Sequence, residues 1–219
     1  MENFDLADHL RSEVIDIREP TCSLPKKILI DTNILYFCYY DRFSQLEILG
    51  ESVRCYQIEA YPIFLKKLFS SEVQLFVHKI ALLEFINLVK KVELKLLYYQ
   101  IYNTPEIPLD FNFKKFSREY YEKYFSIQRR LVIYLNSIRK KFKLVSLSGE
   151  ISQILEDIFL KWQNSLADIG EATMFVEAER DGINSVLSDD SDIVTLSNVR
   201  LYTANEKAIE AFKRKRNQC

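Results

Sequence analysis

Apolar residues along this chain fall into short runs of strand length and longer stretches with helical spacing. The short runs predict strands over 28–31, 73–77, 183–188 and 199–203. The longer stretches predict helices near 6–14, from 33 or 34 onward, over 56–68, over 80–92 continuing to 102, over 116–142, from Ser148 through 159, over 167–181 and over 204–216. Strands alternating with helices indicate an α/β protein with parallel strands.

The first apolar run ends abruptly in polar residues. Ile28, Leu29 and Ile30 are followed by Asp31, then by Thr32 and Asn33. A run without polar alternation is typical of a parallel strand buried on both faces. Open α/β folds place their chemistry at the carboxyl ends of such strands, so we expect Asp31 at the rim of the sheet.

A second apolar run, near the other end of the chain, also ends in acids. Leu187 is followed by the sequence Ser-Asp-Asp-Ser-Asp at 188–192. If the two strands are neighbours, their acidic ends meet, and like charges that close are costly unless a cation neutralises them. The pattern leaves open whether Asp189 or Asp190 faces Asp31.

Two helices offer further carboxylates. Asp168 precedes an Ala-rich helix that closes at Gly182, and Glu84 lies inside an apolar helix. For Glu84 the alternative is a solvated position on the outer face of its helix. Oxygen ligands without histidine or cysteine favour Mg²⁺ or Mn²⁺ over zinc. These residues therefore predict a carboxylate-held magnesium or manganese site.

Composition limits the class of protein. A chain of 219 residues with 48% hydrophobic residues can bury one sizeable core. We expect a peripheral lead-in over 1–26, one domain over 27–205 with a helical insertion at about 93–143, and a basic tail over 206–219. Four scattered cysteines and two histidines suggest neither a zinc site nor a Ser-His triad. Charges interrupt every apolar run and no signal peptide is recognisable, so we expect a cytoplasmic protein without a membrane span.

The net charge of -1 hides an asymmetry. Residues 114–143 hold ten Lys or Arg against two acids, a net +8 that leaves -9 for the rest of the chain. A helix over 116–142 would be about 40 Å long. Basic residues and tyrosines suit phosphate contact and base stacking, although such a face can also be merely solvated. The candidate RNA contacts are Arg129, Arg130, Lys140 and Lys141.

The order of these acidic motifs resembles that of the PIN-domain ribonucleases, over residues 27–92 and 144–205. The resemblance implies a three-layer α/β/α fold with a mostly parallel central sheet, here carrying an additional helical arm. It implies four acidic ligands, an accompanying fifth carboxylate, and polar groups that support the first aspartate. In this chain they are Asp31, Glu84, Asp168 and Asp190, then Asp192, then Thr32 and Asn33, with Ser188 where the family usually has threonine.

For activity, the resemblance implies hydrolysis of RNA phosphodiesters with one or two Mg²⁺ or Mn²⁺ ions and 5′-phosphate and 3′-hydroxyl products. It also suggests the toxin of a toxin–antitoxin pair, with an antitoxin partner, or an RNA-processing enzyme, and a homodimer. One alternative is the same fold without catalysis, as an RNA-binding or interaction module. Another is a phosphatase of the haloacid dehalogenase type, but its usual second acid is Asn33 here.

Overall fold

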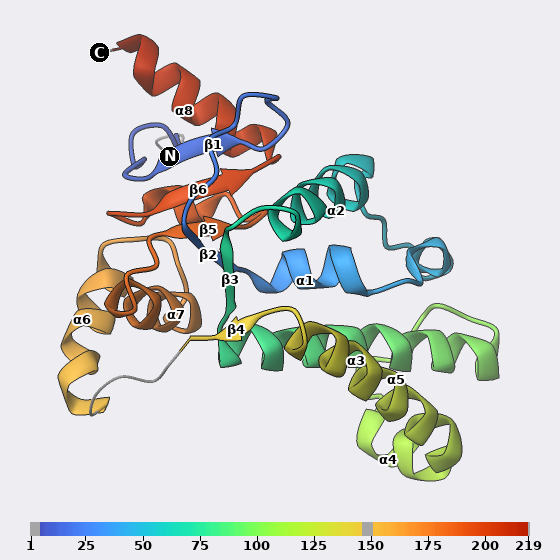
Figure 1. The fold of residues 1–219 in the computed structure, drawn as a ribbon. Coiled ribbons are helices and arrows are strands. Elements are labelled where there is room, and N and C mark those ends of the chain that lie inside the picture. The colour runs from blue at the N-terminus through green and yellow to red at the C-terminus, as the bar shows by residue number, and fades with distance from the viewer. Residues whose placement is uncertain (1–4, 146–150, 219) are drawn as a thin grey trace.

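A parallel sheet of six strands forms the centre of the computed structural model, which describes residues 5–145 and 151–218 (Figure 1). Its strand order is β1-β6-β5-β2-β3-β4. The strands are β1 (Glu13–Asp16), β2 (Lys27–Ile30), β3 (Gln74–Val77), β4 (Lys143–Leu144), β5 (Ser185–Leu187) and β6 (Arg200–Thr203). All five strand pairings are parallel, so the carboxyl ends share one edge.

Helices connect these strands. The α-helices are α1 (Thr32–Tyr39), α2 (Cys55–Phe69), α3 (Lys79–Tyr102), α4 (Phe113–Glu119), α5 (Tyr121–Arg139), α6 (Ile151–Gln163), α7 (Ile169–Arg180) and α8 (Glu206–Gln218). Two 3-10 helices are η1 (Phe43–Leu49) and η2 (Asp192–Thr195). The predicted start of α6 at Ser148 lies outside the described residues.

The two faces of the sheet pack against different helices. Ile28 and Ile30 of β2 join a core cluster with α1, α2, α3 and α5, whereas Leu29 between them joins a second cluster with Phe175 of α7 and Ile209 of α8. Successive strand residues point to opposite faces, so one short strand serves both cores. The predicted three-layer α/β/α architecture is confirmed.

The helix predicted over 6–14 is wrong. Residues 6–9 form turns, and β1 follows at Glu13–Asp16 as an edge strand beside β6. Val14 pairs with Leu201 and Ile15 with Tyr202. Val14 joins the α7–α8 core and Ile15 packs on the opposite one. The sheet therefore extends into the segment predicted as a peripheral lead-in.

The single long helix predicted over 116–142 is also wrong, because the chain breaks at Tyr120 between α4 and α5. Phe116 of α4 packs against Phe111 and Tyr98, with ring centroids 5.2 and 6.1 Å away, at the far end of α3. In contrast, α5 lies along α3 and buries Ile127 and Leu131. The two helices pack on different parts of α3 and diverge. Together with residues 93–102 of α3 they form the helical arm seen in Figure 1.

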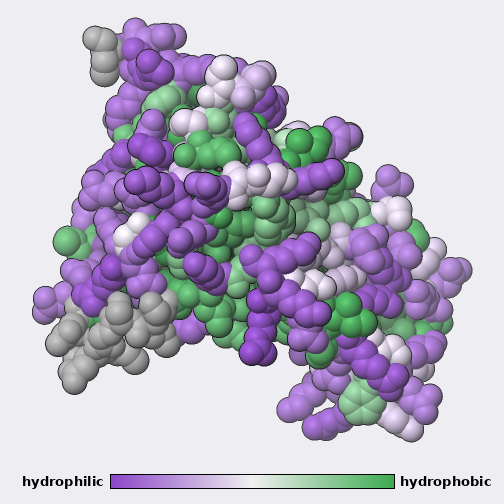
Figure 2. All heavy atoms as spheres, in the orientation of Figure 1, coloured by the Kyte–Doolittle hydropathy of each residue, from purple (hydrophilic) through white to green (hydrophobic). Residues whose placement is uncertain are grey.

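Helix α6 is attached separately from both main cores. Its residues Ile154 and Ile158 pack with Ala172 and Val176 of α7, and these four form a small apolar cluster among the described side chains. Figure 2 shows a largely polar surface on the face in view, with apolar side chains gathered near its middle, around the ends of β3 and β4. None of the helices within 5–145 and 151–218 is both long and apolar enough to span a bilayer.

Candidate functional site

Asp31 lies at the carboxyl edge of the sheet, as its place after an apolar run predicts. Ile30 pairs with Leu187, so β2 and β5 are neighbours, and the Asp31 amide donates to the Leu187 carbonyl at 3.1 Å. Its carboxylate caps α1, where Oδ1 accepts the Thr32 amide at 2.7 Å. Oδ2 accepts the Ser188 hydroxyl at 2.5 Å and Asn33 Nδ2 at 2.7 Å. The hydrogen bonds to this 6%-exposed carboxylate thus come from neutral groups.

Glu84 and Asp168 border the same space. The Thr32 hydroxyl donates to Glu84 Oε2 at 2.6 Å, which turns Glu84 from α3 toward Asp31. Asp168 is the N-cap of α7. A Cβ atom added to Gly170 would lie 3.1 Å from Asp168 Oδ1 and 3.5 Å from Glu84 Oε1. Both carboxylates therefore lie beside Gly170. Glu84 does not occupy the fully solvated position on the outer face of its helix that the sequence left open.

A buried pair fixes the two helices that carry these acids. His78, the N-cap of α3, accepts the Ile80 amide at Nδ1 and contacts Glu177 of α7 through Nε2 at 2.6 Å. Because Nδ1 acts as an acceptor, Nε2 is the atom that donates to Glu177. His78 is fully buried. This contact sets the spacing of α3 and α7, and with it the positions of Glu84 and Asp168.

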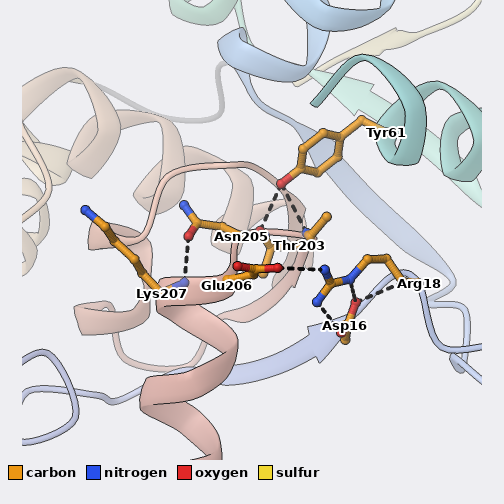
Figure 3. A network of polar contacts seen from close by, with 8 residues as sticks. Asp16, Arg18, Tyr61, Thr203, Asn205, Glu206 and Lys207 are labelled. Carbon is orange, nitrogen blue, oxygen red and sulfur yellow. Dashed lines mark hydrogen bonds and ion pairs between the residues drawn. The ribbon is translucent and has the colours of Figure 1, made fainter. Parts of the chain in front are cut away.

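The structure distinguishes Asp189 from Asp190. The Asp189 carboxylate turns toward α2, where it accepts the Tyr61 hydroxyl at 2.6 Å and Gln57 Nε2 at 2.5 Å. The same Tyr61 hydroxyl lies 3.0 Å from the Thr203 hydroxyl of β6, as Figure 3 shows. The Asp190 amide instead donates to Ser188 Oγ at 2.9 Å, and the charge of the Asp190 carboxylate helps to raise the pKa of Asp31. Asp190 is thus the one that faces the other acids.

Glu171 was not among the residues selected from the sequence, yet it belongs to this group. It forms a capping box with Asp168, in which each backbone amide donates to the other side chain, at 2.8 and 2.9 Å. Burial raises the pKa of Glu171 to about 8, and the charges of Asp190, Asp31 and Asp168 add to that effect. The signal for it was present, because Asp-x-x-Glu before an apolar helix is a capping-box pattern.

The resulting acid cluster has an unbalanced charge. Burial, followed by the charges of Asp190 and Glu84, raises the pKa of Asp31 to about 6, against the opposing hydrogen bonds from Ser188 and Thr32. Burial and Asp190 also raise the pKa of Asp192, which Lys207 partly offsets. The members of the acid cluster are Asp31, Glu84, Asp168, Glu171, Asp190 and Asp192.

The donors of the acid cluster are all oxygens, which suits Mg²⁺ or Mn²⁺. In the conformation described, over 5–145 and 151–218, no group of three or more His, Cys, Asp or Glu side chains is arranged so that it could hold a metal ion. Glu84 is tied to Thr32, and Glu171 is tied to the Asp168 backbone. To hold an ion, one or more of these side chains must turn inward.

The four predicted RNA contacts lie on or beside α5. Arg130 Nη1 is 2.5 Å from Glu93 Oε2. The Lys141 ammonium lies 5.6 Å from the ring centroid of Tyr39, at the end of α1 opposite Asp31. That helix of eight residues is about 12 Å long. Arg129 lines a shallow hollow on α5, and Lys140 is exposed at the end of the helix. In the described part of the chain, no hydrogen bond or ion pair joins these four to the acid cluster.

Neither the sequence model of a known protein family nor the sequence of a curated protein matches this chain significantly. Among solved structures, a chain in the crystal structure of VapBC2 from Rickettsia felis bound to a DNA fragment from their promoter is similar. The two are 11% identical, the match covers 81% of this chain and 98% of that chain, and the TM-score is 0.44. A likeness this weak supports no inference about family or activity.

Proposed function

We propose that the protein is a metal-dependent ribonuclease, which hydrolyses RNA phosphodiester bonds at the acid cluster with Mg²⁺ or Mn²⁺. The observation that carries the proposal is a convergence of carboxylates on the carboxyl edge of one parallel sheet. They come from the residue after β2, from α3, from the start of α7 and from the turn after β5. Buried like charges held by neutral donors are stabilised when a cation joins them. The order of these acids along the chain resembles the PIN-domain ribonucleases.

In this proposal Asp31 and Asp168 are the central ligands. Glu84 and Asp190 bind directly or through water, with Asp192 behind them. A bound ion would lower the pKa of a water molecule and stabilise the charge that develops on the phosphate. Three supporting side chains keep the carboxylates oriented: Ser188 and Asn33 both donate to Asp31, and Thr32 donates to Glu84. Glu171 adds a sixth carboxylate beside Asp168.

The wider role follows from the resemblance alone. It suggests RNA as substrate, 5′-phosphate and 3′-hydroxyl products, and either the toxin of a toxin–antitoxin pair, with an antitoxin partner, or an RNA-processing enzyme. A cytoplasmic location and a homodimer belong to the same proposal. Arg129, Arg130, Lys140 and Lys141 remain proposed RNA contacts, and Arg130 would have to share its guanidinium with Glu93.

The deciding experiment compares RNA cleavage by the wild type, Asp31→Asn and Asp110→Asn, with Mg²⁺ and with EDTA. Asp110→Asn is the matched control, because Asp110 is exposed in the loop between α3 and α4. We expect Asp31→Asn to lose more than about a hundredfold in rate, the upper limit typical of a residue that only supports a metal ligand. Asp110→Asn should cleave as the wild type does. Cleavage that survives both EDTA and Asp31→Asn would contradict the proposal.

The same assay separates the alternatives. RNA that is bound but never cut would favour a non-catalytic binding module. Metal-dependent release of phosphate from small phosphomonoesters would favour a phosphatase. Asn33 argues against the phosphatase, because it stands where that class has its second acid. Its amide nitrogen donates to Asp31, and its oxygen accepts the Asp189 amide at 3.0 Å. That side chain is fully used in holding the two strand ends together.

A further inference from the structure

A polar hollow adjoins the acid cluster between the starts of α2 and α8. It has a volume of about 440 Å³, within the range typical of small-ligand pockets. Asp190 belongs both to its lining and to the acid cluster, so the two are continuous. Its other lining residues include Asn33, Arg54, Tyr56, Asp189, Asn205 and Lys207.

Two cationic side chains line this hollow, and the charge of one of them, Lys207, lowers the pKa of the nearby Asp192. Arg54 is exposed immediately before α2, and Lys207 is exposed in the first turn of α8. Within the described residues neither forms an ion pair. Figure 3 shows Glu206 turned toward Arg18, whose Nη1 lies 3.5 Å from Glu206 Oε1, while Lys207 and Asn205 project the other way. The acid next to Lys207 is therefore directed away from the hollow.

A larger hollow, of about 510 Å³ between α6 and α7, provides a contrast. Its lysine and arginines are already engaged. Lys161 pairs with Glu179 and Arg180 with Asp157, each at 3.0 Å, and Arg11 donates to the Asn164 carbonyl at 2.9 Å. An anion there would have to compete with these contacts. An anion in the hollow beside the acid cluster would displace no such ion pair of the described residues, although it would lie near the Asp189 and Asp190 carboxylates.

The amide groups in the smaller hollow are occupied. Asn205 donates to the Asp189 carbonyl at 2.5 Å and accepts the Lys207 amide at 3.0 Å. Asn33 is bound to Asp31 and to the Asp189 amide, as described above. The lining therefore offers two cations and the half-buried ring of Tyr56, beside the carboxylates of Asp189 and Asp190, with few hydrogen-bonding groups that could read the edge of a base. The Asp189 carboxylate is already bound to Tyr61 and Gln57. Charge together with an aromatic ring is typical of sequence-tolerant binding of single strands.

We propose that this hollow binds the nucleotide next to the scissile phosphate of a single-stranded RNA, with a phosphate between Arg54 and Lys207 and a base or ribose against Tyr56. The inference rests on the proposed ribonuclease function. It requires a single strand, because a base can enter the hollow only when it is unstacked. It also implies little preference for base identity.

The test measures binding of a short fluorescein-labelled oligouridine by anisotropy in EDTA, where cleavage cannot interfere, over a range of salt concentrations. Arg54→Ala and Lys207→Ala should each weaken binding several-fold at low salt and reduce the slope of log K against log [salt] by about 0.7, the value for one phosphate contact on a single strand. Arg54→Lys should keep the slope. Lys66→Ala on α2 and Lys213→Ala on α8 are matched exposed controls and should behave as wild type.

Wild-type slopes in both Arg54→Ala and Lys207→Ala would overturn the inference. So would a preference of a hundredfold or more between oligouridine and oligoadenosine, because the hollow would then be reading bases. Cleavage assays on the same variants separate the two proposals. If Asp31→Asn abolishes metal-dependent cleavage but the salt slopes of Arg54→Ala and Lys207→Ala are unchanged, only the proposed nucleotide subsite is contradicted. If the wild type neither binds nor cuts RNA, the ribonuclease proposal itself is contradicted.

Discussion

Two buried carboxylates in this molecule have opposite surroundings. Asp31 at the sheet edge is 6% exposed, and Glu93 in the arm is 3% exposed. Glu93 accepts Arg42 Nη1 and Arg130 Nη1, each at 2.5 Å, and the Tyr40 hydroxyl at 3.0 Å. Among the described residues, Asp31 accepts hydrogen bonds only from neutral donors, and it faces other acids. The buried charge in the arm is compensated by Arg130 of the arm and Arg42 after α1, whereas the charge at the sheet edge has no such partner in the part of the chain that the structure describes.

This difference separates a structural acid from a reactive one. A buried charge with ionic partners is satisfied by the fold, and removing it leaves those partners unpaired. A buried charge among like charges is satisfied only by a proton or by a cation from outside the chain. Burial alone therefore does not identify the functional acid, and the charge of its neighbours does.

The largest effect on stability is expected at Glu93. Glu93→Gln leaves Arg42 and Arg130 without their anion, and we expect a loss of about 3 kcal/mol in the free energy of unfolding, because breaking a buried ion pair from one side is costly. Urea unfolding followed by circular dichroism measures it. Glu106→Gln, at an exposed position, is the control. Equal losses in the two variants would contradict a structural role for Glu93.

Metal binding should have the next largest effect, and only at the sheet edge. If Mg²⁺ or Mn²⁺ binds the acid cluster, an ion at a hundredfold its Kd should stabilise the wild type by about 2.7 kcal/mol. Asp31→Asn should lose most of that increment, while Glu93→Gln should keep it. Unfolding curves with metal and with EDTA test this. If metal raises the free energy of unfolding of Asp31→Asn as much as that of the wild type, the ion binds outside the acid cluster.

A pH dependence should appear in EDTA. The pKa of Glu171 is raised from 4.5 to about 8 in the folded protein, so the folded state retains a proton that the unfolded state releases. Stability is then greatest below pH 4.5 for this group and falls as pH rises toward 8. The contribution of Asp31 to stability is lost at a lower pH, near the pKa of about 6 that this carboxyl has in the folded protein.

The variant Glu171→Gln isolates the contribution of Glu171 to the pH dependence of stability. The glutamine can still accept the Asp168 amide through its side-chain oxygen, but it does not titrate. We expect its stability to vary less than that of the wild type between pH 6 and 8 in EDTA. Parallel pH profiles for the two proteins would contradict the assignment of Glu171 to the acid cluster.

The smallest effect is expected on the arm. If Arg129 and Lys140 contact RNA, the double variant Arg129→Ala, Lys140→Ala should lose a few-fold in RNA affinity at low salt, with a salt slope reduced by about 0.7 for each contact. Its Mg²⁺ stabilisation should remain, because neither residue contacts the acid cluster. An unchanged slope would make these cations part of a merely solvated face.

The sequence was sufficient to predict the sheet edge and its neighbours. Both strands that carry acids end where an apolar run ends, and the pairing of Ile30 with Leu187 confirms that they are adjacent. It was not sufficient to choose between Asp189 and Asp190. That choice depends on which face of the sheet α2 covers, because alternate residues point to opposite faces. Leu187 shares the α2 core with Tyr61, and Asp189 turns to the same side.

Other features were set by contacts distant in sequence. The four residues of β1 are too few to show a strand period, and their pairing with Arg200–Thr203 makes them a strand. No proline or glycine marks the break at Tyr120. It follows from the packing of Phe116 against Tyr98 of α3, 18 residues earlier in the chain, which no local pattern contains. Glu171 differs, since its capping-box spacing was readable in the sequence.

The separate attachment of α6 has a practical consequence. Among the described residues, four buried apolar side chains and the ion pairs Lys161–Glu179 and Asp157–Arg180 hold this helix to α7. Because the apolar cluster is separate from both main cores, the helix can open locally while the sheet and those cores remain intact. Trp162, the single tryptophan of the chain, lies on α6 with 46% of its surface exposed. Tryptophan fluorescence will therefore report on the surroundings of α6, and α6 amides should exchange with deuterium sooner than those of α7.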